Sequence, residues 1–130
     1  MGKSLAAPES DRLYDIFRRQ AEFDELVAGR WPEVRSWDAS TWLEKEVLAL
    51  LAELGELLGE SNFRWWKRPR ELGPEGRERL LEELADILHF FVSLCLKLGF
   101  GPEELYRAYV RKNEENFRRQ EGRSEKPGYV

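Results

Sequence analysis

Apolar residues recur at helical spacing in four stretches of the chain. The first predicts a helix from Ser10 or Asp11, as its cap, to about Ala28, ended by Gly29. Its apolar arc consists of Leu13, Ile16, Phe17, Phe23 and Val27. Gln20 and Asp24 fall inside that arc, where polar side chains need partners. They are either boundary residues that are hydrogen-bonded within a helical bundle, or they face a ligand.

The second stretch predicts a helix from Ser40, as its N-cap, to about Gly59. Its apolar stripe consists of Val47, Leu50, Leu51, Leu54, Leu57 and Leu58. Acidic residues line one flank of that stripe, namely Glu46, Glu53 and Glu60, with Glu56 slightly further out. Residues 61–76 are rich in aromatic and basic side chains and contain two prolines, which predicts an irregular connection.

The third stretch predicts a helix from Pro74 or Glu75 to about Leu98, followed by a glycine stop. Its apolar arc consists of Leu80, Leu84, Ile87, Leu88, Phe91, Leu94 and Leu98. Glu83 lies in the middle of this arc and Asp86 at its edge. An ionised carboxylate on an apolar face is costly unless it is paired, neutralised or bound to a metal. Glu83 is therefore the strongest physical sign of a site.

The fourth stretch predicts a helix that starts at Pro102. Its apolar side consists of Tyr106, Tyr109, Val110 and Phe117, and an amide row lies beside it, made of Asn113, Asn116 and Gln120. No strand-like alternation occurs anywhere in the sequence. The patterns together predict an all-α, antiparallel four-helix-bundle-like domain over residues 1–130, with residues 1–9 and 121–130 as flexible tails. Because a chain this small leaves few walls for a pocket, we expect dimerisation to complete the bundle.

Composition narrows the class of protein. The 130 residues fit one domain, and a net charge of −4 gives no broad field for nucleic acid. The longest apolar run, from Ile87 to Leu96, is too short to span a bilayer, and the N-terminus lacks the apolar core of a signal peptide. Cys95 is the single cysteine, so we expect an inert core thiol and a cytoplasmic location. From the charge and the apolar runs, we expect neither a nucleic-acid partner nor a membrane partner.

Two acidic couplets carry the candidate chemistry: Glu53-Leu-Gly-Glu56 and Glu83-Leu-Ala-Asp86. Each couplet places two carboxylates on one side of a helix, and the 26 residues between them allow an antiparallel return. Four converging carboxylates suit a hard cation such as Mg²⁺. A di-iron bundle would need two Glu-x-x-His helices, whereas His89 is the only histidine. We expect His89 to be a core or supporting residue rather than a ligand.

The couplets and their spacing resemble the metal signature of the all-α nucleoside triphosphate pyrophosphatases. Three further segments are similar to the dimeric dUTPase family in that superfamily: Asn62-Phe-Arg-Trp-Trp66-Lys, Asp86-Ile-Leu-His89-Phe90 and Lys112-Asn113-Glu-Glu-Asn116-Phe-Arg-Arg119-Gln120. Gln20 followed by Asp24 is similar to the family's Gln-x-x-x-Asn, with Asp in place of Asn. The family's Gly-Tyr arrives several residues late here, at Gly128-Tyr129.

The resemblance implies roles for residues at the matching positions. It implies that Mg²⁺, with Mn²⁺ as an alternative ion, is held by Glu53, Glu56, Glu83 and Asp86. Glu56, together with Glu53, would also orient or deprotonate the attacking water. The implied substrate contacts are Gln20, Asp24, Trp66, Lys112, Asn113, Asn116, Arg119 and Tyr129. Among them, Lys112, Asn116 and Arg119 would contact phosphates, Gln20 and Asn113 would contact the base or the sugar, and Trp66 would line the pocket.

The activity that the resemblance implies is hydrolysis of dUTP to dUMP and pyrophosphate by a homodimer or a higher oligomer. Two alternatives stay open at this point. One is a MazG-like enzyme that accepts several nucleoside triphosphates, and the other is a non-enzymatic helical binding protein with the same fold. The number of metal ions and the phosphorus that water attacks are also open.

Overall fold

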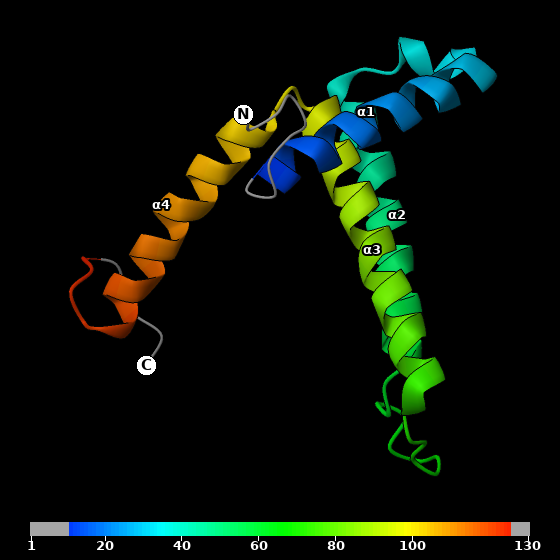
Figure 1. The fold of residues 1–130 in the computed structure, drawn as a ribbon, viewed down its shortest axis with the longest axis vertical. Helices are drawn as coiled ribbons and strands as arrows, with labels where there is room; N and C mark the ends of the chain where they lie inside the picture. The colour runs from blue at the N-terminus through cyan, green and yellow to red at the C-terminus, as the bar shows by residue number, and fades with distance from the viewer. Residues whose placement is uncertain (1–10, 126–130) are drawn as a thin grey trace, which may run out of the picture. The chain divides into compact units, whose positions relative to one another are not determined.

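The computed structural model describes residues 11–125, and every regular element in that range is helical (Figure 1). The elements are α1 (Arg12–Arg30), the short 3₁₀ helix η2 (Pro32–Ser36), α2 (Ala39–Gly59), α3 (Gly73–Lys97) and α4 (Pro102–Gln120). No strand occurs within the described range. The predicted all-α class is therefore confirmed. The predicted tail 1–9 lies outside the described residues, as do residues 126–130 of the predicted tail 121–130.

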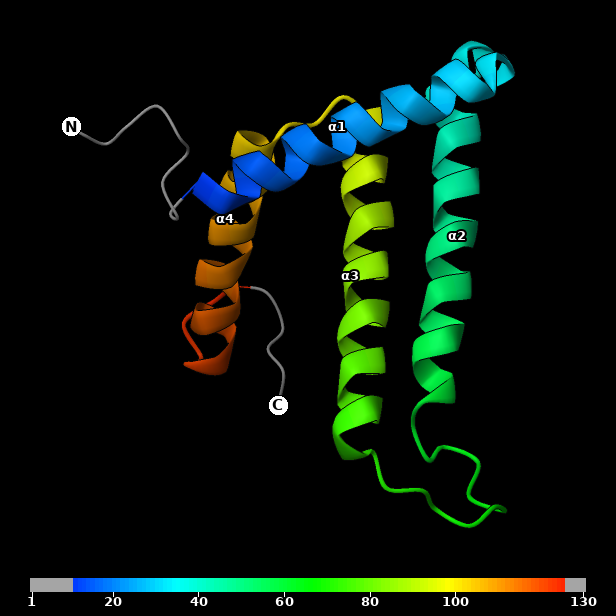
Figure 2. The same ribbon diagram turned by 45° about the vertical axis from the view of Figure 1, so that its right-hand side comes forward.

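The chain divides after Gly99 into two compact units, each of which is considered by itself. In the first unit, α2 and α3 lie side by side and run antiparallel, joined by the irregular residues 60–72 (Figure 2). Helix α1 packs against α3 and is linked through η2 to the start of α2. The second unit contains α4. The single-domain organisation and the completion of a bundle by dimerisation stay predictions.

Two helix ends differ from the expected ones. Helix α2 is capped by Asp38 rather than Ser40, because the Asp38 carboxylate accepts a hydrogen bond from the backbone N–H of Thr41 at 2.8 Å. Helix α1 continues through Gly29 to Arg30, where the backbone N–H of Trp31 closes the last turn on Val27. The expected stop after α3 is present, since Gly99 takes a φ of +88°, a conformation that glycine adopts without strain.

The described part of the chain buries few apolar side chains. The buried ones are Phe17, Val92 and Cys95, of which Val92 is fully buried. Burial raises the pKa of the Cys95 thiol, as expected for an inert core cysteine. Large apolar side chains stay exposed in two stripes at three- and four-residue intervals. The first, on α2, consists of Leu43, Val47, Leu51, Leu54 and Leu58; the second, on α3, consists of Leu81, Leu84, Leu88 and Phe91. Taken singly, none of the helices within residues 11–125 has the length and apolarity to cross a bilayer.

Candidate metal centre and adjoining pocket

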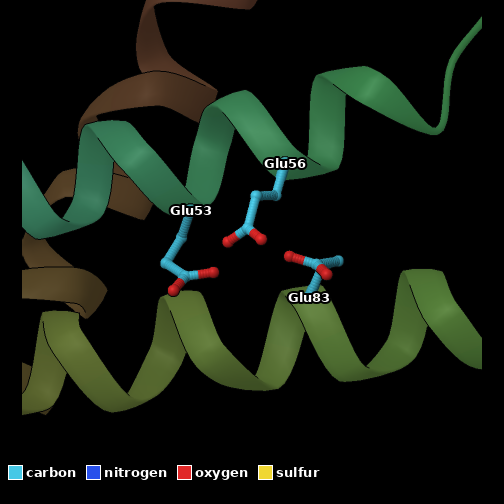
Figure 3. Close-up of side chains that lie close together, drawn as sticks. All are labelled: Glu53, Glu56 and Glu83. Carbon is cyan, nitrogen blue, oxygen red and sulfur yellow. The ribbon is translucent and has the colours of Figure 1, made fainter.

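Three carboxylates meet between α2 and α3 (Figure 3). Glu53 and Glu56 project from successive turns of α2, and Glu83 faces them from α3. One oxygen from each of the three side chains lies within 4.8 Å of the others. The three-residue spacing on α2 and the inward phase of Glu83 on α3 are what bring the groups together. We call these three residues the carboxylate cluster.

The cluster concentrates negative charge, and this charge changes how its members bind protons. The pKa of Glu53 is raised to about 7, first by a hydrogen bond shared with Glu56, then by burial and by the charges of Glu56, Asp86 and Glu83. The pKa of Glu83 is raised by burial first, and then by the charges of Glu56 and Asp86. A divalent cation would reverse both effects, because it stabilises the ionised carboxylates.

The donor atoms of the cluster fit a hard cation. Glu53 Oε2 and Glu83 Oε2 are shielded from solvent and accept no hydrogen bond. A buried carboxylate oxygen without a donor is unfavourable, and a metal ion is one group that satisfies it. Nearby Glu60 is different, since it accepts a hydrogen bond from Arg79 at 3.0 Å. An all-oxygen set of this kind is typical of Mg²⁺ and Mn²⁺ sites.

Asp86, the fourth predicted ligand, lies one helical turn beyond Glu83 on α3. Its oxygens are not part of the three-residue cluster, but its charge helps to raise the pKa of both Glu53 and Glu83. Asp86 also lines a cavity of about 460 Å³. Asp86 thus lies next to the carboxylate cluster and also lines the cavity.

The cavity lies between α1, η2, α2 and α3, and its size is that of a small-molecule site. Its apolar walls are made of Phe23, Val27, Val34, Trp42 and Phe90. Its polar groups come mainly from α1 and α3. A mostly apolar cavity with a few convergent polar side chains, next to residues of raised pKa, is the usual form of a ligand site.

Gln20 and Asp24 belong to a hydrogen-bonded network along one wall of the cavity. Gln20 Nε2 donates to Asp24 Oδ1 at 2.9 Å, and Gln20 Oε1 lies 2.6 Å from His89 Nδ1. Asp24 Oδ2 accepts from Ser93 Oγ at 2.9 Å and from Lys97 Nζ at 3.2 Å. The two interpretations of Gln20 and Asp24 are therefore compatible, since these residues bond one another and also line the cavity.

The structure corrects one expectation and adds residues that sequence reasoning missed. Of the two roles expected for His89, core residue and supporting residue, the core role is wrong, because His89 is solvent-exposed and lines the cavity. Its hydrogen bond with Gln20 is compatible with the supporting role. Ser93, Lys97 and the buried Glu46 were not singled out as site residues. The signal on α3 was available: Ser93 and Lys97 follow Asp86 by seven and eleven residues, close to two and three whole turns, so the three share one edge of the helix.

Trp66 is not brought to this site by the described structure. It lies in the irregular connection, its side chain is 60% exposed, and its ring contacts Trp65 edge-on at 5.6 Å between centroids. It is not among the residues that line the cavity. Its predicted role as a pocket wall stays a prediction.

The predicted phosphate-binding residues belong to α4, in the second unit. Lys112, Asn116 and Arg119 share one face of that helix, because they are four and three residues apart. Arg119 pairs with Glu115 at 3.3 Å, and Lys112 and Asn113 are exposed. Tyr129 lies outside the described residues. The roles predicted for these five residues stay predictions.

The antiparallel α2–α3 pair, with its three facing carboxylates, defines an all-α protein with an acidic cluster between two helices. The chain belongs to the dUTPase family, whose model matches residues 12–100, and this confirms the resemblance seen in the sequence. No solved structure matches the chain significantly.

Two curated relatives illustrate the similarity. The chain is 32% identical to the dCTP pyrophosphatase of Enterobacteria phage T4 over 105 residues, which cover 68% of this chain and 61% of the relative. It is 36% identical to the Homo sapiens dCTP pyrophosphatase 1 over 101 residues, which cover 74% of this chain and 52% of the relative. The chain thus spans about half to six-tenths of the length of these proteins.

Proposed function

We propose that this chain is a nucleoside triphosphate pyrophosphohydrolase that converts a pyrimidine deoxynucleoside triphosphate to its monophosphate and pyrophosphate with Mg²⁺. Family membership and the names of the relatives support the reaction. The observation that carries the proposal is the carboxylate cluster, in which Glu53 and Glu83 each have a buried oxygen that accepts no hydrogen bond. The family's description favours dUTP as substrate, and the relatives' names favour dCTP.

The cluster supplies the acid–base chemistry. Glu53, Glu56 and Glu83 would hold the cation, and Asp86 adds negative charge beside them. A bound Mg²⁺ supplies charge neutralisation for the triphosphate and makes its water a better nucleophile. Glu56 is the proposed acceptor of the proton from the attacking water, and its exposure, as the exposed member of the cluster, supports that role. Water then cleaves the link between the α- and β-phosphates, and pyrophosphate leaves.

The cavity would receive the nucleoside. Its walls include Phe23, Trp42 and Phe90, which offer apolar and aromatic surface to a planar base. Because Asp86 lines the cavity and acts electrostatically on Glu53 and Glu83, a nucleotide seated there would direct its phosphates toward the cluster. The α4 residues Lys112, Asn116 and Arg119 are the proposed phosphate contacts.

The working form that we propose is a homodimer. Its support is the pair of exposed apolar stripes on α2 and α3, which have the helical periodicity of a buried face. Patches of this kind on a soluble chain commonly mark an interface with a partner. A second copy that laid the same two helices against them would cover the stripes on both chains, as a two-fold interface requires.

A substrate panel tests the reaction. The purified chain is incubated with each of the deoxynucleoside triphosphates, dUTP included, and with UTP and CTP, with and without Mg²⁺, and the monophosphate and pyrophosphate are quantified. We expect Mg²⁺-dependent, equimolar release of both products from dUTP, dCTP or both, with slower release from purine nucleotides. Comparable rates for all substrates would favour a broad MazG-like enzyme. Absence of turnover with every nucleotide would overturn the proposal in favour of a binding protein.

A further inference from the structure

We propose that Asp24 is a positioning residue that fixes His89 as a hydrogen-bond acceptor in the cavity, so that the site prefers a base bearing an amino group. Cytosine is the pyrimidine of that chemistry. This inference rests on the proposed function, and it assigns base selection to a network that none of the metal-binding residues belongs to. It follows from the direction of three consecutive hydrogen bonds.

Asp24 sets which group donates and which accepts in each hydrogen bond between Asp24, Gln20 and His89. An ionised carboxylate only accepts hydrogen bonds, so the Gln20 amide must present its nitrogen to Asp24 Oδ1, 2.9 Å away. The other end of the amide is then its carbonyl oxygen, which lies 2.6 Å from His89 Nδ1. A carbonyl oxygen is also only an acceptor. The hydrogen between Gln20 and His89 must therefore be carried by His89 Nδ1.

The consequence appears at the other nitrogen of the imidazole. A neutral imidazole carries one hydrogen, so a hydrogen on Nδ1 leaves Nε2 with a lone pair. His89 is solvent-exposed and lines the cavity, whereas Gln20 is only 6% exposed. The buried part of the network thus sets the polarity of an accessible group, and the cavity presents an acceptor at His89 Nε2.

Lysine and serine hold Asp24 in place from the opposite side. Asp24 Oδ2 accepts from Ser93 and Lys97, and the Lys97 ammonium also contacts Ser93 Oγ at 2.9 Å. Lys97 lies 3.6 Å from the buried carboxylate of Glu46 and 3.9 Å from the centroid of the Trp42 ring. Both groups that bond Asp24 Oδ2 within the described part of the chain are donors, and this prevents the network from reversing its direction.

Cytosine and uracil, the two candidate bases, differ in the group that would face an acceptor at His89 Nε2. Cytosine carries an amino group, a donor, at ring position 4, whereas uracil carries a carbonyl oxygen, an acceptor. An acceptor at His89 Nε2 pairs with the amino group of cytosine and faces the lone pairs of the uracil oxygen. A site built for one hydrogen-bonding pattern discriminates against the other, since the mismatched groups lose solvent without gaining a bond. The structure therefore favours dCTP over dUTP.

The substitution Asp24→Asn should reverse the whole network. Ser93 and Lys97 are donors, so they retain the amide oxygen of the new side chain and turn its NH₂ group toward Gln20. Gln20 must then present its oxygen to that group and its nitrogen to His89 Nδ1. His89 Nδ1 becomes the acceptor, and the hydrogen moves to Nε2, which now donates into the cavity. The size of the side chain hardly changes.

The tautomer of His89 can be read directly, because it is the only histidine in the chain. Its two ring-nitrogen ¹⁵N shifts, recorded at about pH 8, identify the nitrogen that carries the hydrogen. We expect the Nδ1–H tautomer in the wild type and Nε2–H in Asp24→Asn. The ratio of kcat/KM for dCTP to that for dUTP should fall by about tenfold in the variant. The matched control Glu22→Gln, an exposed carboxylate on the same helix, should change neither quantity.

The outcomes separate this inference from the proposed function. An Nε2–H tautomer in the wild type overturns the inference without the use of any variant. A wild type with the Nδ1–H tautomer that prefers dUTP also overturns it, as does a substrate ratio that Asp24→Asn leaves unchanged. If the wild type hydrolyses no nucleotide, the proposed function fails, and titration with dCMP and dUMP decides the inference. Tighter binding of dCMP, seen as a shift of the His89 signals, supports it, and equal binding overturns it.

Discussion

Glu53 on α2 and Glu83 on α3 face one another, and each has a carboxylate oxygen, Oε2, that meets neither solvent nor a hydrogen-bond donor. Two ionised carboxylates held in this way repel one another in the absence of a cation. The same arrangement is favourable once a divalent ion lies between them. The pair therefore lowers the stability of the metal-free protein, and the same two carboxylates supply the negative charge that the proposed reaction uses to hold a cation.

The substitution Glu83→Gln tests this relationship. We expect turnover to fall by at least about 100-fold, because the cation loses a ligand and the amide cannot replace its charge. The metal-free variant should melt at a higher temperature than the wild type, since one of the repelling charges is gone. Kinetics with the better pyrimidine substrate and thermal melting in a chelator measure the two effects.

Glu82→Gln is the matched control for that experiment, because Glu82 is the exposed neighbour of Glu83 on α3. It should leave both turnover and melting temperature close to those of the wild type. Full activity in Glu83→Gln, or an equal loss of activity in the two variants, would contradict the assignment of the cluster as a metal centre.

The metal-free protein should lose stability as the pH rises from about 5 to about 7.5. The folded protein holds the Glu53 pKa at about 7, above the ordinary glutamate value of 4.5, so the folded state binds a proton more tightly than the unfolded state. The stability that this tighter proton binding adds to the folded state is fully present below pH 4.5 and is lost as the pH passes 7. The raised pKa of Glu83 acts in the same direction.

Thermal melts at several pH values, in chelator and in Mg²⁺, check this prediction. In chelator, the melting temperature should decline across that interval. Mg²⁺ should restore it at the upper end, where the carboxylates are ionised and available to the ion. The prediction is wrong if the melting temperature rises through the interval in chelator, or if Mg²⁺ has no effect at any pH.

The sequence predicted those features of the site that depend on residues close together in the chain, and it missed those that depend on packing between distant segments. Periodicity placed Glu53 and Glu56 on one side of a helix and Glu83 on an inner face, because these are local consequences of 3.6 residues per turn. It could not give the axial register of α2 against α3. That register depends on side-chain packing across the pair, and it brings three of the four predicted acids within one cluster.

For the same reason, the sequence predicted only part of the hydrogen-bonded network around Asp24. The sequence showed two polar residues, Gln20 and Asp24, in an apolar arc, but their partners other than one another lie 69 to 73 residues away on α3. Hydrogen bonds over that distance in sequence depend on how α1 crosses α3. The Ser40 cap was wrong for a more local reason, since Asp38 and Ser40 are both good caps, and only the backbone geometry decides between them.

The apolar stripes on α2 and α3 predict self-association that a single charge should disrupt. Leu51, in the middle of the α2 stripe, is 57% exposed. Leu51→Glu should therefore fold, but should place a carboxylate in the proposed interface, where it lacks a partner. Light scattering coupled to size-exclusion chromatography should give a dimer mass for the wild type and a monomer mass for the variant. Glu44→Lys, exposed near the start of α2, should remain a dimer. A monomeric wild type at micromolar concentrations would refute the proposed interface.

Lys97 should be worth more to stability than a typical surface lysine. Its side chain is 18% exposed and lies within 3.6 Å of both the Asp24 and the Glu46 carboxylates. Lys97→Met keeps most of the aliphatic volume, but it leaves two carboxylates facing each other across the network without a cation. Removing one partner of a largely buried ion pair typically costs about 3–5 kcal/mol. We expect the free energy of unfolding, measured with urea, to fall by an amount in that range.

The double variant Lys97→Met with Glu46→Gln shows whether charge causes the loss. It should recover part of the stability lost in Lys97→Met, because it removes one of the two uncompensated carboxylates. Lys45→Met is the control, since Lys45 is exposed on α2 and its ammonium lies 5.6 Å from the centroid of the Trp37 ring. Its cost should stay within about 0.5 kcal/mol. A similar small cost for Lys97→Met would show that Asp24 and Glu46 do not depend on this lysine, and that the network is held by its neutral hydrogen bonds alone.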